Sequence, residues 1–70
     1  MPPAIVCLLD GTCFEGEAEY DGAAVQLDGR VRHERLVEGQ RTVTYGPPVT
    51  RLWPVSRVAV VRWEGNDEAR

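Results

Sequence analysis

Short turn signals recur along this chain and leave room only for short strands between them. They are Asp10-Gly11, Asp21-Gly22, Asp28-Gly29, Glu38-Gly39 and, further on, Gly46-Pro47-Pro48. Asp-Gly and similar pairs are typical of tight turns between antiparallel strands, and no segment of ten or more residues shows helical periodicity. The spacing predicts an all-β fold, a small antiparallel barrel of five to six strands that follow one another as a meander.

The segment from Thr12 to Tyr20 alternates between apolar and acidic side chains, which indicates a strand with one buried face. Its apolar face holds Phe14, Gly16, Ala18 and Tyr20, and its acidic face holds Glu15, Glu17 and Glu19. A two-residue turn at Asp10-Gly11 would set Cys7 opposite Phe14. We then expect Ile5, Cys7 and Leu9 to face the core, while Val6 and Leu8 point outward and need a cover.

The middle of the chain is expected to form three more short strands. A turn at Asp28-Gly29 with a bulge at Gly29 would pair Val25 with Val31 and leave Arg30 and Arg32 in solvent. After Glu38-Gly39 the next strand covers residues 40–45, and the glycine-proline stretch at 46–48 should break the ladder.

The final strand, Arg57 to Trp63, is β-branched and nearly continuously apolar, which is typical of a strand covered on both faces. Pro54 ends the preceding segment, and the residues that follow it are long enough for one 3₁₀ turn. Residues 1–63 should therefore form a single small domain, and residues 64–70 a frayed tail.

The net charge of −3 is too mild to imply a general affinity for nucleic acid or membranes. The charges are unevenly distributed, with six acids and no base in residues 1–29, then seven arginines against two glutamates in residues 30–63. Either neighbouring strands attract each other or one half is a binding surface. The start Met1-Pro2-Pro3 lacks a basic segment, the apolar run after it is short, and no segment could span a membrane. These features predict a cytoplasmic location.

The segment Leu9-Asp-Gly-Thr-Cys-Phe-Glu-Gly16, with Tyr20-Asp21 and Val25-Gln-Leu-Asp28 after it, resembles the first half of Sm-like (LSm/Hfq-like) RNA-associated barrels. The likeness covers about the first 28 residues and implies a small SH3-like or Sm-like barrel. The family's Asn after that Asp is replaced by Ala24 and Val25, its Arg-Gly motif is not seen before Val58, and its N-terminal helix is absent, so its RNA-binding residues are not carried over. The ending Trp-Pro-Val-Ser-Arg-Val resembles small proteins of actinobacteria and their phages, which implies no function.

Few residues suggest chemistry. His33 is the only histidine, but no nucleophile or carboxylate stands at a catalytic spacing from it. Cys7 and Cys13 could form a disulfide or, with His33, ligate a metal. In the expected hairpin, however, the two cysteines face opposite sides, and the cytoplasm keeps thiols reduced, so both thiols should be free. We expect no enzyme, no cofactor and no metal site.

Two functions from different classes remain open. The first is a non-enzymatic interaction module that binds a protein partner or a second copy through an open strand edge or an outward apolar face. The alternative is a barrel that binds single-stranded RNA or DNA, because tryptophan between arginines can stack on bases; Trp53 and Trp63 could equally close the ends of the core. The first is favoured, and the candidate partner-binding residues are Val6, Leu8, Arg51, Trp53 and Arg57.

Overall fold

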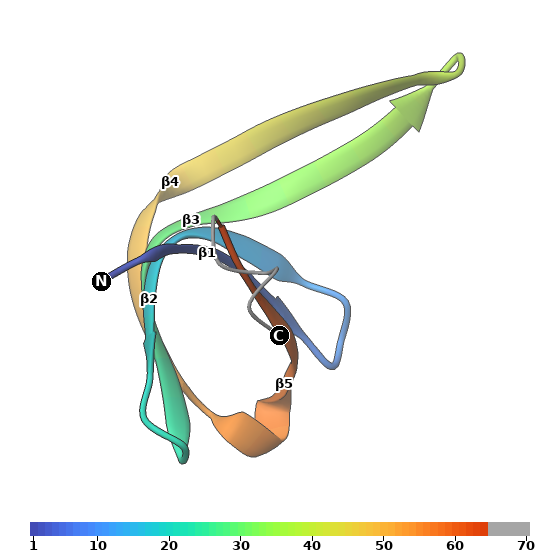
Figure 1. Ribbon diagram of the computed structural model, residues 1–70. Coiled ribbons are helices and arrows are strands. Elements are labelled where there is room, and N and C mark those ends of the chain that lie inside the picture. Colours follow the sequence, from blue (N-terminus) through green and yellow to red (C-terminus); the bar gives the residue numbers. More distant parts are fainter. Residues whose placement is uncertain (65–70) are drawn as a thin grey trace.

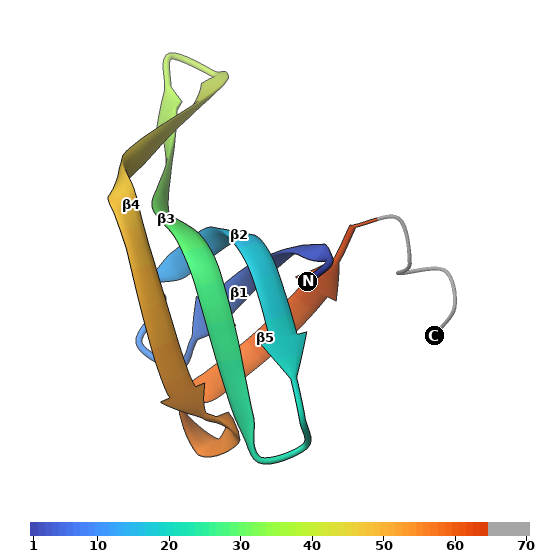
Figure 2. The same ribbon diagram turned by 90° about the vertical axis from the view of Figure 1, so that its left-hand side faces the viewer.

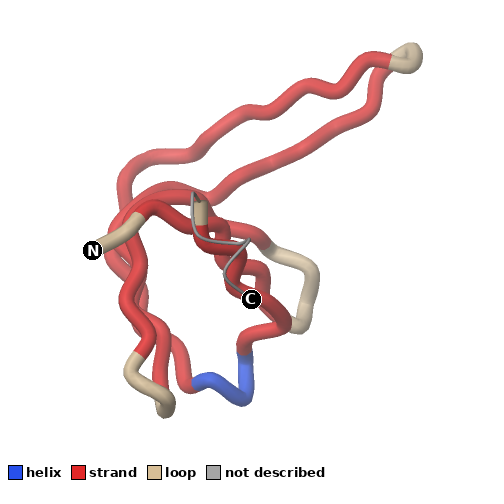
Figure 3. The backbone as a smooth tube through the Cα atoms, viewed as in Figure 1, coloured by secondary structure: helices blue, strands red, loops and turns tan. Residues whose placement is uncertain are grey.

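The computed structural model describes residues 1–64 and consists almost entirely of strands (Figure 1, Figure 3). The elements are β1 (Pro3–Leu8), β2 (Cys13–Tyr20), β3 (Ala24–Val37), β4 (Gln40–Pro54), the 3₁₀ turn η1 (Val55–Arg57) and β5 (Val58–Trp63). The predictions of an all-β chain with a 3₁₀ turn before the last strand are confirmed. The expected tail, apart from Glu64, lies outside the described residues.

The five strands form one antiparallel sheet in the order β4-β3-β2-β1-β5. The first four strands are a meander, and β5 returns to pair with β1, so β4 and β5 are the two edges. The sheet curls strongly, and η1 connects its two edge strands (Figure 1). The Val55 amide donates to the Ala23 carbonyl at 2.9 Å, and the Leu9 amide to the Arg57 carbonyl at 3.0 Å. These bonds hold η1 against the loops next to it.

The core lies on the inner face of the curled sheet and is small. Its buried members are Ala4, Val6, Leu8, Phe14, Ala18, Val25, Leu27 and Trp53. The rings of Phe14 and Trp53 meet with centroids 4.9 Å apart, a separation typical of favourable aromatic pairs. Residues from four of the five strands therefore share one core, while β5 packs against it with half-buried side chains.

The predicted register of β1 is wrong by one residue. Cys7 lies opposite Cys13 and Val6 opposite Phe14, because the loop holds three residues, with Gly11 at φ 94°, a common three-residue hairpin form. A shift of one residue moves every side chain to the other face. Val6 and Leu8 are therefore buried, and Leu9 is 67% exposed.

The turn predicted at Asp28-Gly29 does not exist, because β3 continues through both residues. Gly29 lies directly opposite Gly16 in the pairing of β2 with β3. A Cβ atom on either glycine would overlap the backbone of the opposite strand. The glycine at position 29 thus permits a close approach of two backbones. Val25 pairs with Tyr20 and Trp53 instead of Val31.

Two other expectations need correction. The glycine-proline stretch at 46–48 does not end a strand but lies inside β4, where its pairing with β3 shifts register between Arg30 and Arg32. The last strand is an edge strand with its outer face open, since Val60 is 47% exposed. It is not covered on both faces, as its apolar sequence suggested.

Candidate interaction surface

Cys7 and Cys13 form a disulfide across the β1–β2 hairpin. The prediction of two free thiols is wrong for the same reason as the register, because the three-residue loop places both cysteines opposite each other on the outer face. Disulfides persist mainly in oxidising compartments. The disulfide does not support the cytoplasmic location expected from the sequence. That location is untested and stays a prediction.

We expect the native protein to have a mass two hydrogens below that of the reduced chain and to take up no alkylating reagent before reduction. Closing so short a loop restricts the unfolded chain, so Cys7→Ala/Cys13→Ala should lower the free energy of unfolding by about 2 kcal/mol. Mass spectrometry and urea unfolding measure both effects. Two thiols that alkylate without reductant would contradict the disulfide.

The outer half of the β3–β4 hairpin projects away from the rest of the sheet (Figure 1, Figure 2). We call residues 32–45 the arm. Its turn is formed by Glu38 (φ 51°) and Gly39 (φ 79°), and two positive φ angles in a two-residue loop match the right-handed twist of a hairpin. Leu36 is 75% exposed, and Val37 and Tyr45 are also exposed. The arm thus presents apolar side chains to solvent.

A polar network joins the base of the arm to β2. The Glu15 carboxylate accepts from Arg32 Nε at 3.2 Å and from the Tyr45 hydroxyl at 2.9 Å. Glu34 pairs with Arg32 and Arg41, each at 2.8 Å. The hydrogen bond from Arg32 lowers the pKa of Glu34, and the bond to Glu15 raises the pKa of Tyr45. Single surface pairs stabilise little, but this network spans three strands and orients the arm.

The Tyr45 hydroxyl should titrate above the ordinary tyrosine pKa, because ionisation would remove its hydrogen bond to Glu15 and leave a phenolate beside that carboxylate. In a Tyr20→Phe background, the phenolate absorbance reports Tyr45 alone. Glu15→Gln should bring the pKa back toward the ordinary value. The stabilisation is present below the unfolded pKa and is lost as the pH rises through the folded one. Titration at the ordinary value in both proteins would contradict the Glu15–Tyr45 bond.

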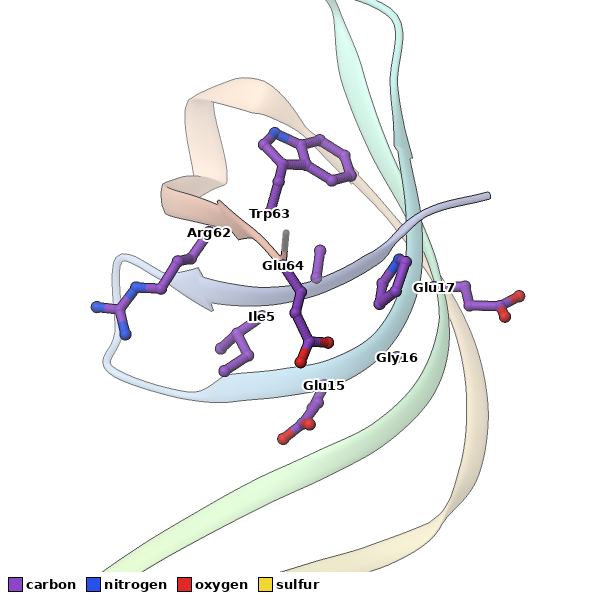
Figure 4. A pocket seen from close by; sticks show the side chains of 9 residues that line it. Ile5, Glu15, Gly16, Glu17, Arg62, Trp63 and Glu64 are labelled. Atoms are coloured by element: carbon purple, nitrogen blue, oxygen red, sulfur yellow. The ribbon is translucent and has the colours of Figure 1, made fainter. Parts of the chain in front are cut away.

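A groove of about 390 Å³ lies on the outer surface where β1, β2 and β5 meet, and Glu15, which bonds to the base of the arm, also lines it. Its apolar lining includes Pro3 and Ile5, its charged groups are Glu15, Glu17, Glu64 and Arg62, and the Trp63 indole points to the core side of the sheet (Figure 4). Figure 4 shows the Glu64 side chain reaching over the groove toward Ile5 and Glu15, while Arg62 and Glu17 point out to the two sides. The groove combines apolar walls with three carboxylates and one guanidinium.

The structure separates the five residues predicted to bind a partner. Val6 and Leu8 lie in the core, and Trp53 is buried against Phe14, 9% exposed. Arg51 and Arg57 are exposed, but the indole expected between them faces inward. The surface that sequence reasoning missed is the arm, whose only local signal was the Glu38-Gly39 turn.

Of the other side chains with chemical potential, His33 is exposed on the arm and Glu15 belongs to the polar network. Among residues 1–64, no group of three or more His, Cys, Asp or Glu side chains could hold a metal ion. Within that same range no helix is long and apolar enough to cross a membrane. Comparisons with family models, curated proteins and solved structures find no match to this chain.

Proposed function

We propose that this protein is a non-enzymatic interaction module that binds a protein partner through its arm. The observation that carries the proposal is the exposure of Leu36, Val37 and Tyr45 on a hairpin that projects from the sheet. An isolated two-stranded hairpin is marginally stable in water. A partner surface would cover these side chains and order the arm.

We infer further that the curled sheet closes as a small SH3-like or Sm-like barrel. The strand order, the 3₁₀ turn between the edge strands and the inward position of Trp53 support this inference. Such closure leaves the arm as the part of β3 and β4 that contributes least to the core. The length of the arm is then not explained by packing in the core, whereas binding of a partner would explain it.

Binding of single-stranded nucleic acid is the weaker candidate. It required an exposed indole on which a base could stack, and Trp53 packs against Phe14 instead. The acidic side chains Glu17 and Glu19 on the outer face of β2 also oppose a polyanion. Arginines remain exposed, so the experiment below distinguishes the two candidates.

A variant without the arm tests the proposal. Arg32 pairs with Tyr45, so replacing residues 33–44 by Asn-Gly gives a two-residue hairpin loop that leaves the core intact. Far-ultraviolet circular dichroism should be β-like for both proteins. In nuclease-treated extracts of cells producing tagged protein, the full chain should elute as a complex on size exclusion and the armless variant as a monomer.

Every other outcome of this experiment contradicts the proposal, and a full chain that is a monomer with and without nuclease would contradict both candidates. A full chain that elutes as a monomer only after nuclease treatment would establish the nucleic-acid candidate. An armless variant that stays in the complex would place the interface on another part of the sheet.

A further inference from the structure

The arm and the groove of this chain have complementary surfaces. The arm carries three arginines against two glutamates, and the groove is lined by three glutamates against one arginine. The end of the arm exposes Leu36 and Val37, and the groove has apolar walls. Arg32 and Glu15 already pair with each other within one chain, so Arg35 and Arg41 on the arm and Glu17 and Glu64 in the groove are the charges left for a second copy.

We propose that the end of the arm of one copy docks in the groove of a second copy, and that two such contacts form a closed dimer. The proposal rests on the proposed function and names the partner as this chain itself. An interface in which arm meets groove can be made twice around a two-fold axis, because each copy brings one arm and one groove.

The arm provides cations beside its apolar tip. Arg35 forms no ion pair within residues 1–64, and Arg41 is 72% exposed despite its contact with Glu34. In the groove, Glu17 and Glu64 are exposed and form no ion pair among those described residues. Docking would bring these opposite charges together at the rim of an apolar contact, an arrangement typical of protein interfaces.

The groove is large enough for the tip of the arm, and the small core of the chain would gain from the added burial. A volume of about 390 Å³ lies within the range of sites that enclose small groups, which is enough to accept the aliphatic side chains of a hairpin tip. Among residues 1–64 the core holds only eight buried residues, and a chain of 70 residues has a thin margin of stability. Burial of Leu36 and Val37 by a second copy would add apolar area that the monomer lacks.

A charge exchange between the two surfaces tests the proposal on purified protein. Sedimentation velocity should show dimers of the wild type. Arg35→Glu/Arg41→Glu and Glu17→Arg/Glu64→Arg should each weaken association by about tenfold or more. An equimolar mixture of the two variants should recover dimers, because the reversed arm of one fits the reversed groove of the other.

Leu36→Ser supplies an apolar test with a matched control. It should weaken the dimer, whereas Leu52→Ser, at a leucine 68% exposed on β4 beyond the arm, should not. A wild type that is monomeric at all concentrations, variants that associate like the wild type, or a mixture that stays monomeric would each overturn the proposal. If the wild type is monomeric when pure but enters an arm-dependent complex in extracts, the proposed function stands and only the identity of the partner is wrong.

Discussion

Leu8→Asp should unfold this protein, whereas Leu9→Asp should leave it folded. The Leu8 side chain is 8% exposed in the core, and a carboxylate there would lose its hydration without gaining a partner. The expected loss is about 4 kcal/mol or more, which is comparable to the entire stability of a small domain. Urea unfolding followed by circular dichroism measures it.

The neighbouring leucine is a control of the same residue type. Leu9 is 67% exposed in the β1–β2 loop, so its replacement by aspartate should change the free energy of unfolding by less than about 0.5 kcal/mol. The register predicted from the sequence requires the opposite result, with Leu9 inside and Leu8 outside. A tolerant Leu8 and a sensitive Leu9 would therefore show that the structural register is wrong.

Gly29→Val should destabilise the protein by about 3 kcal/mol, although valine normally favours strands. A Cβ atom at position 29 would overlap the backbone of Glu15 and Gly16 on β2, and backbone atoms cannot move aside as a flexible side chain can. Thermal unfolding measures the change. Gln26→Val on the exposed face of the same strand is the control and should be tolerated. Equal stability of both variants would contradict the close approach of the β2 and β3 backbones at Gly16 and Gly29.

The sequence predicted the elements well wherever turns and alternation were unambiguous. Asp21-Gly22 and Glu38-Gly39 do end strands, and the 3₁₀ turn follows Pro54 as expected. A turn was wrongly predicted at Asp28-Gly29, because in the sequence a glycine required for close approach of two backbones cannot be distinguished from a glycine required for a turn. Only the opposite strand, which contributes Gly16, distinguishes the two roles.

The register of β1 could not be derived from its pattern. Residues 4–9 are apolar at every position, so either face could enter the core, and a register is weakly specified when both faces are equivalent. The loop length and the Cys7–Cys13 pairing decide it. Val6 and Leu8, chosen as partner-binding residues because they were expected to point outward, lie in the core for that reason.

The arm escaped prediction because its features depend on contacts between distant residues. Tyr45 meets Glu15 from thirty positions away, and exposure of Leu36 follows only from the absence of a third strand beside it among the described residues. In the sequence, Trp53 between Arg51 and Arg57 indicated a binding surface more strongly than any residue of the arm. The Trp53 side chain instead belongs to the core.

Photo-crosslinking from the arm in living cells is the most direct test of the central claim that the arm binds protein. A photoreactive amino acid is placed at Leu36 or, as a control of similar exposure, at Leu52. The account predicts protein adducts from position 36 and few from position 52, and peptide mass spectrometry shows whether they join the groove of a second copy. Adducts to nucleic acid, or equal protein adducts from both positions, would contradict it.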